Sequence, residues 1–271
     1  MKIECLDHGY VELLDHFGDD STVAKSARVS FSQEEEAKTT EENSKLIDYL
    51  WRNSHSSPFE QVAFRFKMKL PIFVARQFAR TRTAKLNEVS ARYAELDEEF
   101  YIPEDFHNAS ASVKQGRSDN VHEFSGQFKE DYQDLMEKSF EMYQHAVSIG
   151  VAKEEARIIL PVATYTTWVW QIDLSNLLKT LTLRCDSHAQ YEIRVYANAM
   201  LDLIRPIVPQ AVEAWERHSR DSIKLTPEEV KLFKSMIQDQ NSQVEANMEL
   251  GERGLRILNE KLGLPKAEQG L

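Results

Sequence analysis

The chain has 271 residues, of which 42% are hydrophobic, and a formal net charge of -11 at pH 7. This is enough apolar material to build the core of one large domain. The sequence pI of about 5.3 argues against a general nucleic-acid-binding protein, because affinity for a phosphate backbone needs a broad positive surface.

Targeting and redox features are sparse. The N-terminal residues lack the basic and apolar regions of a signal peptide, and no apolar run approaches the roughly 20 residues that span a bilayer. The two cysteines, Cys5 and Cys185, form neither a disulfide framework nor a metal-binding spacing. We therefore expect a soluble cytoplasmic protein with no membrane partner, no nucleic-acid partner and no bound metal.

The N-terminal elements follow from hydrophobic periodicity. Near alternation of apolar and polar residues over 3–14, interrupted at His8 and Gly9, predicts two short strands or one bent strand. Two helices are expected, at 23–29 and at 42–52, with the intervening segment as a loop or a frayed helix start. The clearest strand is 62–70, in which apolar side chains alternate with basic ones.

The stretch Pro71–Tyr93 concentrates positive charge in an acidic chain. Pro71 suits the first turn of a helix, on which Arg76 and Arg80 would share a face because they are four residues apart. Guanidinium groups repel one another and offer donors shaped for carboxylate or phosphate. We interpret the stretch as the binding site of a small anion; the alternative is a solvated, salt-bridged helix.

The middle of the chain mixes a long loop with strong helical signals. Residues 106–125 are the most loop-like part. An amphipathic helix follows and is expected to end at Gly150. A helix at 153–160 carries Arg157. Residues 162–172 have strand propensity. Because leucines at helical spacing follow them, a helix over much of this segment is the alternative prediction.

Two capping boxes are expected near the C-terminal end. Ser187 and Gln190 are spaced to open a helix to about Ile204, which would place Arg184 just before a helix N-terminus that favours anions. A second box at 226–229 predicts a helical extension to about residue 262. We expect two parts, 1–220 and 221–271, the second serving packing or subunit contacts.

Several blocks of the sequence, taken in order, resemble one family. Residues 71–93 are similar to the Arg-His-Arg and Ser-x-Arg signature of the flavin-dependent thymidylate synthases, and further similar blocks read SARVSF, HSSPFE, EARIILP and LRCDSHAQYEI. The resemblance covers roughly residues 1 to 205. It implies an α/β (α+β) fold with an antiparallel sheet core and packed helices, in a homotetramer with active sites shared between subunits. It also implies methylation of dUMP to dTMP, with methylenetetrahydrofolate as carbon donor, FAD as hydride carrier and NADPH as reductant.

The resemblance assigns roles position by position. It assigns the nucleotide contacts to Gln77, Arg80, Glu88, Ser90, Ala91, Arg92, Arg157 and Arg184. It assigns the cofactor side to His55, Ser57, Glu60, Arg80, Thr81, Arg82, Glu88, Asp173, Lys179 and His188. Arg184 is the candidate catalytic residue, because an arginine against the uracil edge can stabilise negative charge that develops on the ring.

The chain departs from the family pattern on the flavin or folate side. The four departures are Thr81 for histidine, Lys85 for serine, and Asp173 and Lys179 for asparagine. They leave open a family member that modifies C5 of a related pyrimidine nucleotide, for example by hydroxymethylation, and a nucleotide-binding homologue without catalysis. A further alternative is covalent catalysis by Cys185, which would need a lowered thiol pKa.

Overall fold

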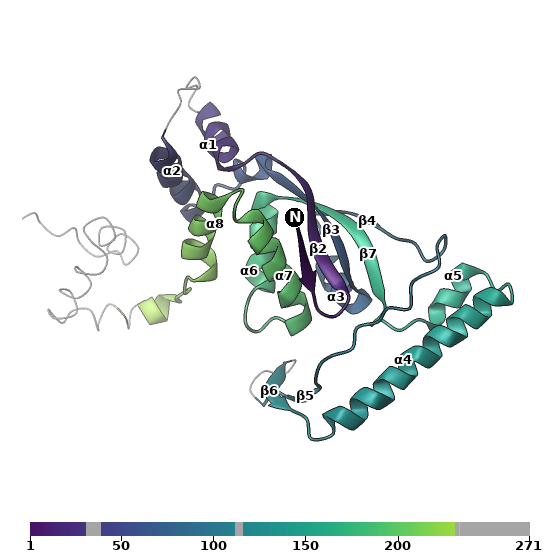
Figure 1. Ribbon diagram of the computed structural model, residues 1–271. Helices are drawn as coiled ribbons and strands as arrows, with labels where there is room; N and C mark the ends of the chain where they lie inside the picture. Colours follow the sequence, from purple (N-terminus) through teal and green to yellow (C-terminus); the bar gives the residue numbers. More distant parts are fainter. Residues whose placement is uncertain (31–38, 112–115, 231–232, 234–271) are drawn as a thin grey trace, which may run out of the picture. The chain divides into compact units, whose positions relative to one another are not determined.

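The computed structural model describes residues 1–30, 39–111, 116–230 and 233. The chain divides into two units, Met1–Asp221 and Ser222–Leu271. The first unit is a mixed helical and antiparallel-sheet domain (Figure 1), which confirms the predicted fold class. In the part of the chain that is described, no helix is long and apolar enough to cross a membrane.

The main sheet has five antiparallel strands in the order β1-β2-β3-β7-β4. Their bounds are Lys2–Cys5 (β1), Gly9–Phe17 (β2), Ala63–Pro71 (β3), Lys85–Glu88 (β4) and Tyr165–Asp173 (β7). The predicted pair β1 and β2 and the predicted strand β3 are confirmed. In β3, Phe64, Phe66 and Met68 are fully buried while Arg65 is exposed, which is the alternation that the sequence predicts.

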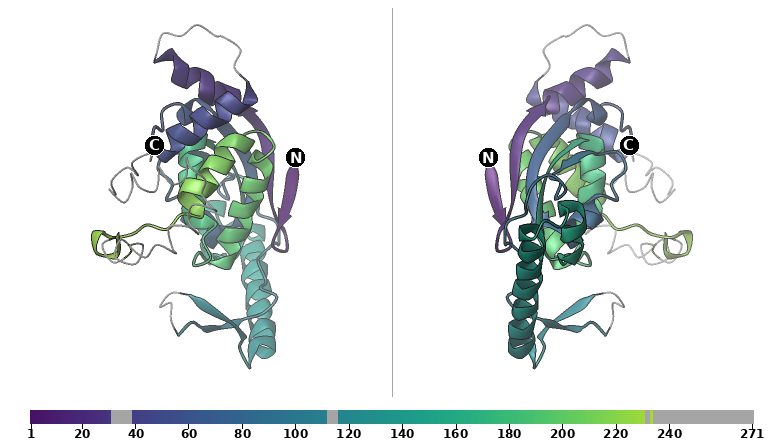
Figure 2. Two further views of the ribbon diagram at one scale, coloured as in Figure 1. Left: turned by 90° about the vertical axis from the view of Figure 1, so that its left-hand side faces the viewer. Right: turned by 90° about the vertical axis from the view of Figure 1, so that its right-hand side faces the viewer.

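Helices cover the apolar face of this sheet. Helix α7 (Tyr191–Ile204) packs against β1 and β2, and α6 (Leu174–Arg184) packs against α7 (Figures 1 and 2). The other helices of this unit near the sheet are α1 (Asp20–Val29), α2 (Thr40–Arg52), the 3₁₀ turn η1 (Phe59–Gln61), α3 (Ile72–Phe78), α8 (Pro209–Trp215) and the π-helical η3 (Glu216–Arg220). The buried strand faces share one apolar core with these helices, except η3, which has no buried residue.

Between β4 and β7 the chain forms a separate excursion, visible in Figure 1 beside the sheet. It contains the hairpin strands β5 (His107–Ala109) and β6 (Arg117–Val121), helix α4 (Ser125–Ser148), helix α5 (Lys153–Ala156) and the 3₁₀ turn η2 (Arg157–Ile159). The loop prediction for 106–125 is therefore wrong where β5 and β6 pair. The predicted amphipathic helix is confirmed, and Gly150 after it has a φ of 89°.

One row of apolar side chains on α4 faces solvent. Phe128, Leu135 and Met142, with Ile149 just after the helix, are each more than half exposed and recur every seven residues. Two helical turns separate successive members, so they lie along one face. Exposed apolar surface of this extent is typical of an interface.

Three local predictions near the site are corrected. Residues 165–173 are strand and not helix, because β7 pairs with β3 on one side and β4 on the other. Helix α3 ends at Phe78, so Arg80 lies beyond it and does not share a helix face with Arg76. The helix carrying Arg157 is shorter than expected, since α5 ends at Ala156 and a single 3₁₀ turn follows.

The two predicted capping boxes have different outcomes. Helix α7 begins at Tyr191 with Gln190 as its N-cap residue and without a side-chain cap bond, so the box between Ser187 and Gln190 is wrong. The box at 226–229 is confirmed: the Thr226 and Glu229 side chains each accept a hydrogen bond from the other residue's backbone N–H. The rest of the predicted C-terminal helix lies outside the described residues.

Candidate functional site

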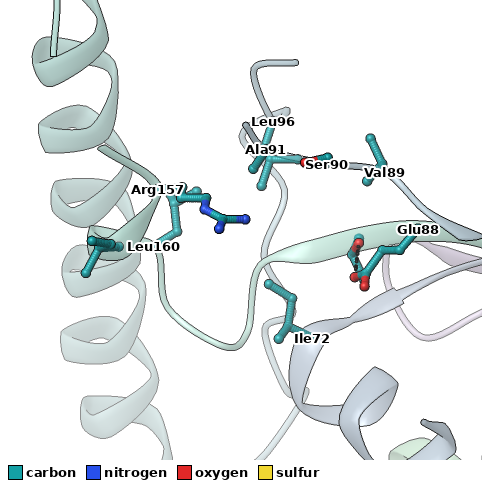
Figure 3. Close-up of a pocket in the computed structure, with 10 residues that line it drawn as sticks. Ile72, Glu88, Val89, Ser90, Ala91, Leu96, Arg157 and Leu160 are labelled. Atoms are coloured by element: carbon teal, nitrogen blue, oxygen red, sulfur yellow. Dashed lines mark hydrogen bonds between the residues drawn. The ribbon is translucent and has the colours of Figure 1, made fainter. Parts of the chain in front are cut away.

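A pocket of about 480 Å³ lies at the end of the sheet where β3 runs into α3 (Figure 3). We call it the Arg157 pocket; its wall includes Glu88, Ser90 and Ala91 from the segment at the end of β4, and Arg157 from η2. Figure 3 shows the Arg157 guanidinium directed into this space. The structure thus brings together four of the residues that the sequence assigns to the nucleotide.

A hydrogen bond at the floor of the Arg157 pocket fixes the Glu88 side chain. The Thr166 hydroxyl on β7 donates a hydrogen bond of 2.7 Å to the Glu88 carboxylate. Thr166 is buried and also lines the pocket. Glu88 therefore presents a fixed acceptor in the same pocket as the cationic Arg157, and the pocket can bind a ligand that has both donor groups and an anionic group.

The Arg92 side chain forms an ion pair with a carboxylate of the same chain. Its Nε and Nη2 atoms lie 3.1 Å and 2.9 Å from Oε2 of Glu154 on α5. The backbone carbonyl of Glu154 in turn accepts a hydrogen bond from Nε of Arg157 at 3.4 Å. Glu154 thus contacts two of the four arginines that the sequence assigns to the nucleotide, Arg92 and Arg157.

Arg184 and Gln77 form a second group, between α3 and α7. Arg184 is the last residue of α6 and does not directly precede the N-terminus of α7; its Nη2 donates to the backbone carbonyl of Gln77 at 3.2 Å. The Gln77 amide donates to the side-chain oxygen of Gln190 at 2.7 Å. Burial, and after it the charge of Arg80, lowers the pKa of Arg184 from its usual value. Two cations close together with partial desolvation form a place where a negative charge is stabilised.

A larger pocket of about 920 Å³ lies between α1, α2 and the turn that follows α2. We call it the Glu60 pocket, because Glu60 lines it together with His55 and Ser57, all three assigned to the cofactor side. Leu46 and Tyr49 of α2 give it an apolar wall. Its volume falls within the range of about 300–1,000 Å³ that is typical of small-molecule and cofactor pockets.

The two pockets lie at opposite ends of strand β3. Glu60 precedes the strand, whereas Ile72, which follows it, lines the Arg157 pocket. Nine extended residues span about 30 Å at roughly 3.3 Å per residue. Among the described residues, no side chain lines both pockets. Within one copy of the chain the Arg157 pocket is therefore separated from the Glu60 pocket, which holds three of the residues assigned to the cofactor.

Glu88, which is assigned to both ligands, lines the Arg157 pocket, and the other positions assigned to the cofactor line neither of these two pockets. Thr81 is in the turn after α3, Arg82 is exposed, and His188 is bonded to Asp186 at 2.9 Å. Asp173 is the N-cap of α6, and both of its carboxylate oxygens accept hydrogen bonds from Asn176. Lys179 lines a third, smaller pocket together with His55.

Sequence reasoning missed several residues that complete the site. Thr166 was hidden within an apolar strand, and Glu154 lies 62 residues from its partner Arg92. The strand-to-strand register, in which Glu88 lies opposite Trp168, brings Glu88 to Thr166, and no local pattern specifies that register. A signal was available only for Glu154, which stands three residues before Arg157.

The cysteine alternative is disfavoured by the structure. Burial raises the pKa of the Cys185 thiol to about 11. A nucleophilic cysteine needs the thiolate, and so small a thiolate fraction at neutral pH argues against that role. Among the described residues, no group of three or more His, Cys, Asp and Glu side chains could hold a metal ion.

The fold is that of an α+β protein with an antiparallel sheet and a pocket at each end of strand β3. The sequence profile of the family described as "Thymidylate synthase complementing protein" matches residues 12–210. The chain belongs to this family, which confirms the resemblance seen in the sequence.

Individual relatives agree with the family match. A protein of Treponema denticola named flavin-dependent thymidylate synthase is 42% identical over 265 residues, which cover 96% of this chain and 97% of that protein. One of the same name from Dictyostelium discoideum is 41% identical over 86% of this chain and 80% of its own length. The crystal structure of PolB from Streptomyces cacaoi, described as a UMP/dUMP methylase bound with 5-Br dUMP, matches with a TM-score of 0.73 and 32% identity over 80% of this chain and 99% of that chain.

Proposed function

We propose that the chain is a flavin-dependent thymidylate synthase that methylates dUMP to dTMP. The observation that carries this is 42% identity to the Treponema denticola enzyme over nearly the full length of both chains. In the balanced reaction, methylenetetrahydrofolate supplies the carbon, NADPH supplies a hydride and solvent supplies one proton. The C5 proton of dUMP is displaced, and dTMP, tetrahydrofolate and NADP⁺ result.

The nucleotide is proposed to bind at the Arg157 pocket. Arg157 and the Ser90 hydroxyl suit its phosphate, with Arg92 and Arg80 as further cations. Arg184 is placed to stabilise negative charge on the uracil as C5 attacks the carbon donor. Because Arg184 is partly desolvated, its charge acts more strongly than it would in open water.

FAD is proposed to bind at the Glu60 pocket. The apolar wall of Leu46 and Tyr49 suits a planar ring system, and the polar groups of His55, Ser57 and Glu60 suit its edge. Bound there, the flavin supplies hydride transfer; the residues of this chain hold and orient it.

The proposal includes a homotetramer with active sites shared between subunits. It is supported by the separation of the two pockets along β3 and by the exposed apolar row on α4. A second copy could bring its Glu60 pocket to the Arg157 pocket of the first. The proposed location is the cytoplasm, since the two free thiols suit a reducing compartment. Light scattering of the purified protein tests the assembly, and a monomer would contradict it.

The function is tested by incubating the purified protein with FAD, NADPH, dUMP and labelled methylenetetrahydrofolate. We expect labelled dTMP that depends on NADPH. A hydroxymethyl product that forms without NADPH would favour the alternative modification of C5. A protein that remains colourless with added FAD and forms no product would favour a nucleotide-binding homologue. A parallel reaction with UMP tests whether the substrate range extends to the ribonucleotide.

We predict that Glu154→Gln binds dUMP more tightly, by up to about fivefold, because an exposed ion pair of this kind is worth about 0.2–1 kcal/mol. The substitution removes the carboxylate that holds Arg92 and frees the guanidinium for the phosphate. Calorimetric titration with dUMP measures the change.

The neighbouring Glu155→Gln is the matched control for this prediction. It removes the same charge one residue away, and Glu155 is exposed. We expect it to leave dUMP affinity unchanged, and deoxyuridine, which lacks the phosphate, to bind both variants alike. Equal dUMP affinity in Glu154→Gln and Glu155→Gln would exclude competition by Glu154.

A further inference from the structure

The excursion between β4 and β7 leaves the sheet and returns to it through two segments that pair with each other. The Tyr101 N–H donates to the Ala163 carbonyl and the Tyr165 N–H to the Glu99 carbonyl, each at 2.9 Å, in an antiparallel arrangement. We call the paired residues the root of the excursion; they are 99–101 on the way out and 163–165 on the way back.

The carboxylate of Asp7, in the turn between β1 and β2, contacts both segments of the root. Its Oδ2 atom accepts a hydrogen bond of 2.9 Å from the N–H of Ile102, which directly follows the outgoing segment. Its Oδ1 atom accepts one of 2.5 Å from the Tyr165 hydroxyl, in the returning segment. Hydrogen bonds to an ionised carboxylate are stronger than those between neutral groups. One side chain therefore ties both segments of the root to the β1-β2 hairpin.

The Tyr165 hydroxyl is a dependable donor to Asp7. Tyr165 is buried, and this burial, followed by the hydrogen bond to Asp7, raises the pKa of its hydroxyl far above the usual value. The hydroxyl therefore keeps its proton at neutral pH and donates it to the carboxylate. The next residue along β7 is Thr166, which fixes Glu88 at the floor of the Arg157 pocket. The contact with Asp7 thus lies directly beside the strand position on which that pocket depends.

Helix α4 connects the root to the arginine of the Arg157 pocket. Near its N-terminal half, the Tyr132 hydroxyl donates to the Tyr101 carbonyl of the root at 2.8 Å. About two helical turns further along, the Ser139 hydroxyl donates to the Ile159 carbonyl at 2.8 Å. Ile159 belongs to η2, the turn that carries Arg157. A displacement of the root is therefore passed along α4 to η2.

The Arg157 pocket takes its walls from both sides of this connection. Ile72, Glu88 and Thr166 belong to the sheet and to the start of α3, whereas Arg157 and Leu160 belong to the excursion. The distance between the cationic wall and the carboxylate wall thus depends on how the excursion is held against the sheet. The root, with Asp7, holds it there.

We propose that Asp7 is a positioning residue for the nucleotide. It fixes the root of the excursion and, through α4, the place of the Arg157 guanidinium in the pocket. Asp7 lines neither the Arg157 pocket nor the Glu60 pocket, so it acts through other residues and not on a ligand. The inference rests on the proposed function, which places the phosphate of dUMP on Arg157.

Replacing Asp7 with asparagine should raise the dissociation constant of dUMP about three- to tenfold, the scale of effects that are passed through intervening contacts. The amide nitrogen of asparagine cannot accept a hydrogen bond, so either Ile102 or Tyr165 loses its partner. The direction of the change is diagnostic, because loss of a negative charge would by itself tighten the binding of an anion. Calorimetric titration measures the constant. Deoxyuridine, which lacks the phosphate, should bind with an unchanged constant.

Two further variants accompany this measurement. Asp15→Asn is the matched control, because it removes the same charge from the same hairpin, where the Asp15 carboxylate pairs with Arg65 at 2.7 Å. We expect wild-type affinity for dUMP in this control. Tyr165→Phe removes one of the two hydrogen bonds of Asp7 from the other partner and should weaken dUMP binding in the same direction.

A double-mutant cycle tests whether Asp7 acts through Arg157. In an Arg157→Gln background, Asp7→Asn should change the dUMP constant less than about twofold, because the residue that Asp7 positions is already lost. The same loss as in the wild-type background would overturn the proposal. So would equal weakening of dUMP and deoxyuridine, which would mean a general loss of structure, or a dUMP constant for Asp7→Asn equal to that of Asp15→Asn.

Hydrogen exchange tests the positioning without a ligand. The backbone amides of residues 157–160 should exchange faster in Asp7→Asn than in the wild-type protein, whereas those of α6 should exchange at the wild-type rate. Equal exchange of 157–160 in the two proteins would overturn the proposal. Failure of the proposed function is distinguishable, because it is recognised by a wild-type protein that forms no dTMP, and the exchange experiment needs no turnover.

Discussion

Replacing Arg184 with lysine should lower kcat by about 100- to 1,000-fold, the loss typical of removing one preorganised donor from a developing anion. Arg184 is partly buried, donates one hydrogen bond to the Gln77 carbonyl and is near Arg80. Lysine keeps the charge but loses the planar fork that can contact the edge of a uracil with two parallel donors. The KM of dUMP should change much less than kcat, because other residues bind the phosphate.

Arg194→Lys is the matched control. Arg194 also donates from its guanidinium to a backbone carbonyl, that of Ser187, and lies on α7. We expect near wild-type kcat for this variant and similar melting temperatures for both. Steady-state kinetics with the intact protein decides, and a wild-type kcat in Arg184→Lys would remove this arginine from the chemistry.

Replacing Gly9 with alanine should lower the melting temperature by about 6–12 °C. A Cβ atom at this position would lie 1.8 Å from the Tyr196 hydroxyl and under 3 Å from the carbonyl oxygens of Cys5 and Lys69. The hydroxyl itself donates to the Lys69 carbonyl at 2.8 Å, so it cannot withdraw without loss. Overpacking typically costs about 1–3 kcal/mol, and crowding against backbone places this site at the upper end. For a domain of this size, about 3 kcal/mol corresponds to that shift.

Two further variants test whether the contact with Tyr196, and not the loss of a glycine in itself, lowers the melting temperature. Gly126→Ala in α4 meets no atom within 4 Å, and alanine should leave the melting temperature unchanged or slightly raised. The double variant of Gly9→Ala with Tyr196→Phe removes the nearest atom and should recover part of the loss. Calorimetry measures all three, and a melting temperature for Gly9→Ala within 1 °C of wild type would contradict the prediction.

Local patterns in the sequence predicted the elements that have one solvent-facing side. β3 alternates Phe64, Arg65 and Phe66, so its period of two is plain. β7 has Trp168 and Trp170 in the core, Thr167 and Val169 between and beside them are half-buried, and the leucines beyond the strand already belong to α6. Pairing with distant strands determines that this segment is a strand and not a helix. A short window of sequence does not contain that information.

In the candidate site, too, some features were predictable from the sequence and others depend on the fold. The cluster of arginines between 76 and 92 was visible because like charges were close in sequence. The ion pair of Arg92 and the hydrogen bond from Thr166 to Glu88 join residues 62 and 78 positions apart, and only the fold shows them. The end of α3 at Phe78, before Arg80, was likewise beyond the reach of helical spacing.

Because the two pockets lie at opposite ends of β3, the effect of combining two mutations in one cell depends on which pocket each mutation alters. If sites are assembled from two chains as proposed, a chain that is defective only near Glu60 still carries an intact Arg157 pocket. A chain defective only near Arg157 still carries an intact Glu60 pocket. In a cell that carries both alleles, some sites would combine the intact Arg157 pocket of one chain with the intact Glu60 pocket of the other. Mutations at opposite ends of β3 would therefore complement each other, whereas mutations at the same end would not.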